Sequence, residues 1–311
     1  MAQADHFDLS RNNGSSPSVH NAGAAIKGDF TANIRLVWLS LLAVVIGLAC
    51  AVVALVLQRL IAFFTNVFYF QRFEIPHELI SPANNSLGLL AILVPVVGGL
   101  IIGFMARFGS ERIRGHGIPE AIEAILISGS RMQPKVAVLK PLSSAISIGS
   151  GGPFGAEGPI IMTGGACGSI FAQIFHMTTA ERKTLLVAGA AGGMSATFGT
   201  PVAAVLLAVE LLLFEWKPRS FVPVAIASAV AAAMRPYLGL DAAPLFGVDV
   251  HMSHPGISTL LATVVIGLSA GVLSLLLTWA VYAAEDAFHR LPIHWMWWPM
   301  IGGLAIGIGG L

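Results

Sequence analysis

The sequence predicts an all-α, polytopic membrane protein built from tilted and half-spanning helices. Hydrophobic residues make up 56% of the chain and charged residues only 11%, whereas a soluble domain carries about 25% charged residues. Long apolar segments recur along the chain, and the charged residues cluster between them. Several later apolar segments are too short to cross about 30 Å of hydrocarbon as single helices. Such segments survive in a membrane when protein covers them, which predicts half-spanning helices packed against one another.

The chain divides into a polar N-terminal tail and a membrane domain. Residues 1–33 are rich in Ser, Asn, Gly and Asp and lack the apolar core of a signal peptide, so we expect a flexible tail. Residues 34–70 are almost wholly apolar. This run exceeds the roughly 20 residues that a perpendicular spanning helix needs, which predicts a long, tilted helix.

A second apolar run covers residues 87–108. Basic residues lie before the first run and after the second, whereas the segment between the two runs carries Glu74 and Glu78. Because cytoplasmic loops are enriched in Lys and Arg, the basic ends are predicted to be cytoplasmic. These basic residues are Lys27, Arg35, Arg107, Arg112 and Arg114.

Beyond residue 114 the apolar segments become shorter and are broken by proline, glycine or charged turns. Each of them is predicted to be a helix, and some are predicted to span only half of the bilayer. They cover residues 121–127, 136–148, 160–175, 185–198, 202–214 and 221–234. A long run over residues 257–284 follows, and the chain ends inside another apolar segment.

Glu157 lies in the most unusual stretch of the chain, the glycine- and proline-rich residues 149–159. Glycines leave the backbone amides open to close approach, and Pro159 suits the first turn of a helix. A helix that starts here would present free N–H groups and the positive end of its dipole, which favours an anion. A carboxylate at membrane depth is a candidate functional group. A first-turn glutamate also serves as simple dipole compensation, and Glu157 alone does not separate these two readings.

A similar constellation stands upstream, where residues 114–120 read RGHGIPE and open another apolar segment. It again combines glycines, a proline and an acidic residue, Glu120. Two interrupted hydrophobic segments with glycine-rich starts indicate a binding site built from broken helices near the bilayer midplane.

Other features exclude several classes of function. The net charge of +1 argues against a nucleic-acid partner, which requires a basic face. Cys50 and Cys167 lie in apolar stretches and are interpreted as small buried hydrophobes, not as a disulfide or a metal site. No hydrolase, nucleotide-binding or dinucleotide-binding motif occurs, and no cofactor is expected.

The remaining histidines and tryptophans have simpler interpretations. His251, His254, His289 and His294 lack metal-ligand spacing. The tryptophans near the C-terminal end of the sequence are interpreted as an interfacial aromatic belt. They are Trp295, Trp297 and Trp298.

These motifs resemble those of the CLC family of chloride channels and proton-coupled chloride transporters. GHGIPE at residues 115–120 is similar to the family's GSGIPE motif, and GAEGP at residues 155–159 is similar to GREGP. TPVAA at residues 200–204 stands in the place of the NAPLAG stretch. Lys140, 17 residues before Glu157, takes the place of the pathway lysine. The resemblance covers residues 34–311 and rests on three ordered motifs at compatible spacing.

The resemblance implies a homodimer in which each subunit has its own anion path and contains two halves of opposite membrane orientation. Residues 34–235 would form the first half, and residues from about 256 to 311 the start of the second. The family's GSFxP motif and pore-lining tyrosine would lie past Leu311, so the chain is expected to be a truncated piece of a longer, multi-pass inner-membrane protein.

The resemblance also implies residue roles. Glu157 would be the gating carboxylate, which competes with chloride because two negative charges in a low dielectric repel strongly. Backbone amides would bind the anion weakly enough to release it. The residues expected to contact the anion are His116, Gly117, Ile118, Gly155, Ala156, Glu157 and Gly158, and Lys140 would lie on the pathway.

Two residues depart from the family pattern. His116 replaces the usual serine, and its imidazole could donate to an anion or bond to a neighbouring carbonyl. Leu211 replaces the inward-side glutamate that antiporter members use for protons, and on a helix Glu210 would point about 100 degrees away. The sequence therefore favours channel-like chloride conduction gated by Glu157. Proton-coupled exchange of chloride, nitrate or fluoride is the alternative, and an intramembrane enzyme is a distant third because no nucleophile or metal set accompanies Glu157 and His116.

Overall fold

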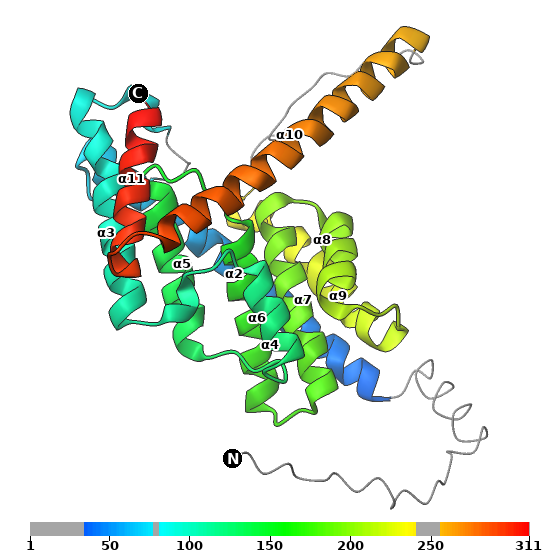
Figure 1. The fold of residues 1–311 in the computed structure, drawn as a ribbon. Coiled ribbons are helices and arrows are strands. Elements are labelled where there is room, and N and C mark those ends of the chain that lie inside the picture. Colours follow the sequence, from blue (N-terminus) through cyan, green and yellow to red (C-terminus); the bar gives the residue numbers. More distant parts are fainter. Residues whose placement is uncertain (1–33, 77–80, 241–255, 311) are drawn as a thin grey trace, which may run out of the picture.

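The computed structural model describes residues 34–76, 81–240 and 256–310, and its regular elements over these ranges are helices. The predicted tail, residues 1–33, lies outside the described residues, as do His251 and His254. The all-α prediction is confirmed for the described part of the chain. Figure 1 shows a bundle of packed helices from which one long helix, α10, extends.

The helices agree closely with the apolar segments of the sequence. The longer elements are α2 (Ile34–Phe70), α3 (Leu93–Phe108), α4 (Ile118–Leu126), α5 (Pro134–Gly149), α6 (Glu157–Ile174), α7 (Thr179–Phe198), α8 (Pro201–Ala208), α9 (Pro218–Met234), α10 (Ile257–His289) and α11 (Trp298–Gly309). The short ones are η1 (Pro82–Asn84), η2 (Gly88–Ile92), η3 (Glu111–Ile113), the π turn η4 (Val209–Leu213), η5 (Pro236–Leu238) and η6 (Trp295–Trp297).

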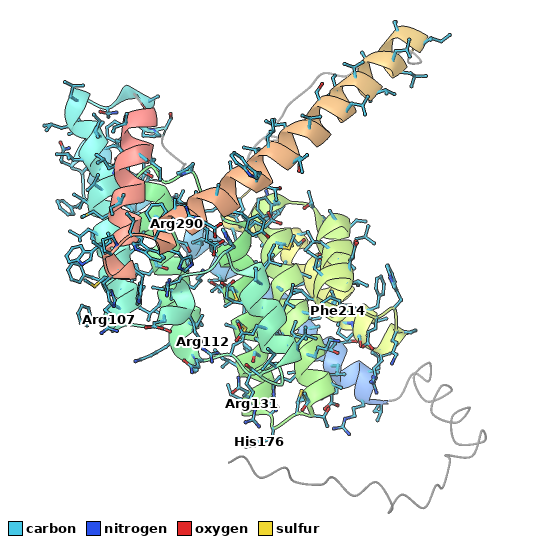
Figure 2. All side chains as sticks on the ribbon, in the orientation of Figure 1. Arg107, Arg112, Arg131, His176, Phe214 and Arg290 are labelled. Carbon is cyan, nitrogen blue, oxygen red and sulfur yellow. The ribbon has the colours of Figure 1, made fainter. Side chains whose placement is uncertain are left out.

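Three helical segments are long and apolar enough to cross a membrane: Ile34–Phe70, Gly88–Phe108 and Ile257–His289. By contrast, α4 has 9 residues and is therefore only about 14 Å long at 1.5 Å per residue. The chain thus combines spanning helices with short ones, as the breaks in its hydrophobic pattern predicted. Figure 2 places Arg107 and Arg131 at the same end of the bundle as the start of α2.

The centre of the bundle is α7, whose residues from Thr184 to Ala196 are all buried between α2, α6 and α9. Small residues permit this close packing. A side chain on Gly164 of α6 would collide with the carbonyl of Gly189 on α7, and a side chain on Gly189 would collide with the carbonyl of Gly164. Cys50 of α2 donates its thiol to the Gly189 carbonyl at 3.2 Å. Cys50 and Cys167 are free cysteines. Cys50 is buried, as its apolar surroundings predicted, whereas Cys167 is only half-buried.

Capping interactions fix the start of α7 next to the start of α2. The Thr178 hydroxyl accepts a hydrogen bond from the Glu181 N–H at 3.4 Å, and the Glu181 carboxylate accepts one from the Thr178 N–H at 3.0 Å. This reciprocal arrangement satisfies two backbone donors at the helix start. The same carboxylate pairs with Arg35 of α2, so it also links two helices.

The last helix, α11, packs antiparallel on α3 through reciprocal glycines. Gly99 of α3 abuts the backbone of Pro299, and Gly103 abuts the carbonyl of Met296. In return, Gly303 of α11 abuts the carbonyl of Pro95, and Gly307 abuts that of Ile92. Each helix thus carries two glycines four residues apart, the spacing that brings helix backbones together in membranes.

In contrast, α10 has no buried residue. It extends away from the bundle in Figure 1, and its exposed apolar side chains run along most of its length. Its C-terminal end returns to the bundle, where Phe288 and His289 pack against Trp298 with ring centroids 5.9 and 5.2 Å apart.

The contact between α3 and α11 predicts that alanine substitution of two adjacent glycines changes the stability of the protein differently. We expect Gly303→Ala to destabilise the protein by about 1–3 kcal/mol, because the new methyl group overpacks against the Pro95 carbonyl. Gly302 faces open space, so Gly302→Ala is expected to be neutral, or stabilising by up to about 1 kcal/mol through helix propensity. Thermal unfolding of the two variants in mild detergent checks this prediction, and equal unfolding midpoints would contradict it.

Candidate functional site

The two glycine-rich motifs meet backbone to backbone. Gly117 precedes α4 and has φ +108°, a conformation that glycine adopts far more readily than other residues. A side chain on Gly117 would collide with the Gly158 carbonyl, and a side chain on Gly158 would collide with the His116 carbonyl. The starts of α4 and α6 therefore lie in direct contact, although about 40 residues separate them in the sequence. Two positive helix ends thus converge on one region.

Glu120 holds the start of α4. Its carboxylate accepts a hydrogen bond of 2.6 Å from the Gly117 N–H, and it fills the space that a side chain on Gly115 would need. Glu120 is thus a capping residue, and the Gly117 N–H is already engaged. Pro119 has no N–H, so Ile118 supplies the first amide of α4 that lacks a partner within the helix.

Lys140 binds the loop that leads into α4, at the carbonyls of residues 113 and 115. Its side chain is only 3% exposed. Its ammonium group donates to the Ile113 carbonyl at 3.0 Å and also to the Gly115 carbonyl. Two carbonyl dipoles partly replace the water that a buried ammonium loses. Lys140 therefore positions the loop that leads into the first motif.

Glu157 is the first residue of α6, and its side chain is exposed to a cavity. Within the described ranges, its carboxylate has no ion pair or hydrogen bond with another residue. Next to it, Gly158 lies against the first motif and Pro159 occupies the first turn. The glutamate thus stands free at the positive end of a helix, which is where the sequence predicted it.

The cavity beside Glu157 has a volume of about 720 Å³. One wall is formed by the two motifs, and a second by α5, whose Ser143, Ser144 and Ser147 face the space. The third comes from the end of α10 and the start of α11. Of the residues expected to contact an anion, His116, Ile118, Gly155, Glu157 and Gly158 line this cavity, while Gly117 and Ala156 belong to the same turns without lining it.

The third wall was missed by the sequence interpretation. Trp295 and Trp298 line the cavity, and the Arg114 guanidinium lies over the Trp295 ring, 4.1 Å from its centroid. Trp297, in contrast, packs on Phe104 at a centroid distance of 6.0 Å. The cluster is therefore not a uniform interfacial belt, because two of its members face inward. No local signal in the sequence links residue 114 to residue 295.

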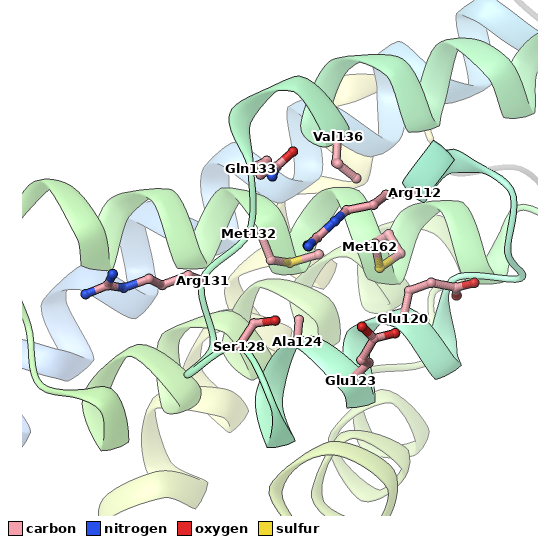
Figure 3. A pocket seen from close by; sticks show the side chains of 10 residues that line it. All are labelled: Arg112, Glu120, Glu123, Ala124, Ser128, Arg131, Met132, Gln133, Val136 and Met162. Carbon is pink, nitrogen blue, oxygen red and sulfur yellow. The ribbon is translucent and has the colours of Figure 1, made fainter. Parts of the chain in front are cut away.

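A smaller cavity of about 50 Å³ lies on the other side of α4. Figure 3 shows Arg112 extending towards Met132 and Met162, with Glu120 and Glu123 nearby on α4. Its lining mixes both signs of charge, and its volume suits a few water molecules. Glu120 contributes to this cavity while it caps α4.

Two further sequence expectations concern residues away from the Glu157 cavity. Leu211 is half-buried and Glu210 is exposed, and both lie in the π turn that continues α8. Neither residue lines the cavity. Within the described residues, no three His, Cys, Asp or Glu side chains lie together in a way that could hold a metal ion.

Comparisons with known proteins agree with the motifs. A family model described as "Voltage gated chloride channel" matches residues 97–311. The chain is 29% identical over 239 residues to the voltage-gated ClC-type chloride channel ClcB of Citrobacter koseri, covering 74% of this chain and 55% of that protein. It is 30% identical over 233 residues to the H(+)/Cl(-) exchange transporter ClcA of Klebsiella pneumoniae, covering 71% and 48%. The chain thus spans about half the length of the curated relatives it matches.

Solved structures show the same fold at low sequence identity. A slow cyanobacterial Cl-/H+ antiporter superposes with a TM-score of 0.73 at 19% identity, covering 90% of this chain and 64% of that one. A CLC-type fluoride/proton antiporter gives a TM-score of 0.70, also at 19% identity, with 89% and 66% covered. At this identity the likeness concerns the fold alone.

The Lys140 contacts predict a stability difference between two lysines of α5. Lys140→Met would leave the Ile113 and Gly115 carbonyls without their donor, and we expect a loss of about 1–3 kcal/mol. Lys135→Met is the matched control, because Lys135 is exposed on the same helix and surface changes usually stay within about 0.5 kcal/mol. Thermal unfolding in detergent measures both, and an unaltered midpoint for Lys140→Met would refute the anchoring role.

Proposed function

The chain belongs to the voltage-gated chloride channel (CLC) family, and from this premise we propose that it forms part of a membrane path for chloride or another small anion, gated by Glu157. One observation carries the proposal. A carboxylate without a partner among the described residues stands at the cavity edge where the starts of α4 and α6 are in contact. Converging helix starts attract an anion, and a carboxylate in the same place competes with that anion for the same dipoles.

The donors of this site are neutral. Backbone amides near Ile118, Gly155 and Gly158 would bind the anion through dipoles, which hold an ion weakly enough for it to leave. Gly117 and Ala156 would contribute through the same turns. His116 lines the cavity, where its imidazole would offer a further donor. Lys140, whose ammonium is occupied by two carbonyls, would act on the path through the position of the loop.

We favour channel-like conduction because Leu211 provides no carboxylate at the position where antiporter members carry one for protons. The second candidate is proton-coupled exchange of chloride, nitrate or fluoride. It is supported by the names of relatives, which include an H(+)/Cl(-) exchange transporter and a CLC-type fluoride/proton antiporter.

A test of both candidates records chloride flux and pH change together, using the full-length protein in liposomes. Conduction predicts chloride flux without stoichiometric proton movement, whereas exchange predicts protons in a fixed ratio to chloride. The absence of anion flux under both a chloride and a pH gradient would refute the proposed function.

Within this assay, Glu157→Gln is expected to raise the anion flux or to remove its pH dependence, because a neutral amide mimics the protonated carboxyl group. Glu123→Gln is the matched control, since Glu123 is an exposed carboxylate on α4 that does not line the Glu157 cavity. If Glu157→Gln leaves both the flux and its pH response as in the wild type, Glu157 serves only to compensate the helix dipole.

We further propose that the full-length protein is a homodimer in an inner membrane, in contact with lipid. Val202 and Leu206 are 72% and 49% exposed on one face of α8, four residues apart, so they form a short apolar stripe available for a second copy. The mass in mild detergent, measured by light scattering with the detergent contribution subtracted, is expected to be twice that of one chain. A mass equal to one chain would contradict the dimer.

A further inference from the structure

The loop that carries Glu157 is held by a side chain that the sequence analysis did not single out. Residues 150–156 join α5 to α6 and lead directly into Glu157, the first residue of α6. The hydroxyl group of Tyr69, near the C-terminal end of α2, donates a hydrogen bond to the carbonyl of Ser150 at 3.3 Å. Tyr69 is 7% exposed and Ser150 is 2% exposed, so water has little access to this bond.

Two glycines make room for this contact. Gly151 has φ +90°, and a side chain on it would collide with the hydroxyl group of Tyr69. A side chain on Gly98 of α3 would collide with the side chain of Ser150. Ser150 therefore contacts both α2 and α3, and the tyrosine reaches its carbonyl because position 151 has no Cβ atom.

The first half of the loop is also fixed by backbone contacts. A side chain on Gly149, the last residue of α5, would collide with the backbone of α2 at Thr65. The N–H groups of Gly151 and Gly152 donate to carbonyls near the end of α5 at 3.0 and 2.9 Å. Residues 153–155, in contrast, are exposed. The loop is thus held at its start and open to solvent before it enters α6.

Glu157 therefore lies between two restraints on the backbone. On its C-terminal side, Gly158 abuts the carbonyl of His116. On its N-terminal side, the loop is held at Ser150 by Tyr69. The carboxylate itself has no partner among the described residues, so its place in the cavity follows from the place of its backbone.

The charge on Glu157 responds to the groups that share its cavity and to the positive ends of α4 and α6. Tyr69→Phe removes one hydroxyl group and no charge near neutral pH, so it can alter the response of Glu157 only through geometry. The other ionisable side chains that line the cavity are Arg114, His116, Lys140, Glu285 and His289.

We propose that Tyr69 is a positioning residue, which holds the loop at Ser150 and thereby sets how closely the Glu157 carboxylate approaches the two helix starts. The inference rests on the proposed function, in which protonation of Glu157 frees the anion path. A carboxylate is stabilised at a positive helix end, and this effect falls off within one turn. A looser loop lets the carboxylate move away, so the charged form loses stabilisation and Glu157 is protonated at higher pH.

The pH profile of chloride flux, measured on the full-length protein in liposomes, tests this role. We expect Tyr69→Phe to move the midpoint of the pH response to higher pH by about half a unit, which is within what one hydrogen bond supplies. Thr65→Val is the matched control. Thr65 is buried on the same helix, but its hydroxyl group donates to the Ile61 carbonyl of that helix at 2.9 Å, so no shift is expected.

A midpoint that stays in place in Tyr69→Phe, or moves to lower pH, would overturn the inference while the proposed function stands. A second comparison uses the Glu157→Gln background, in which Tyr69→Phe should leave the flux unaltered because the group that it positions no longer titrates. An equal change of flux in both backgrounds would show that Tyr69 acts on the fold and not through Glu157, and would also overturn the inference.

Hydrogen exchange tests the hold on the loop independently of transport. Mass spectrometry of peptides that cover residues 150–156 in the full-length protein should show faster amide exchange in Tyr69→Phe and wild-type rates in Thr65→Val, because a loosened loop opens its backbone hydrogen bonds more often. Unaltered exchange in Tyr69→Phe would overturn the inference. Faster exchange in a protein whose wild type carries no anion flux would refute the proposed function and leave the hold of Tyr69 on the loop established.

Discussion

The direct contact between the backbones of Gly117 and Gly158 is the constraint on which the rest of the site depends. A single methyl group at either position would separate the two segments, because each would collide with a carbonyl or backbone atoms of the other. The contact places the starts of α4 and α6 side by side, so their positive ends act on the same space. Lys140 and Glu120 then fix the loop between residues 113 and 120 by bonding to its backbone.

The same rule of close packing organises the larger fold. Gly164 and Gly189 bring α6 against α7, and the glycines of α3 and α11 interlock in the same way. Lipid tails are as apolar as leucine, so hydrophobicity alone does not hold helices together in a bilayer. Van der Waals contact between closely approaching backbones takes over that role. Within the described ranges, α10 shows the contrast, because its long apolar surface remains uncovered.

The cavity joins parts of the chain that are distant in the sequence. Its walls come from the two motifs, from the serine face of α5 and from the junction of α10 and α11. The α3–α11 glycine contacts hold that junction in place and therefore bring Trp295 and Trp298 to the cavity that Glu157 also lines. The cavity lining thus includes both a carboxylate, Glu157, and a guanidinium, Arg114, that lies over the Trp295 ring.

The sequence by itself determined the helical class, the bounds of most helices and the motif residues. The hydrophobic runs ended where Pro, Gly or charges interrupted them, and α2 covers the predicted run from residue 34 to residue 70. These features are local, and a residue's own chemistry controls them. Only the tertiary structure decided that Lys140 binds the loop carbonyls and that Trp295 and Trp298 line the cavity. These contacts join residues that are 25 to 181 positions apart in the chain, and a local sequence pattern does not predict which distant segments approach each other.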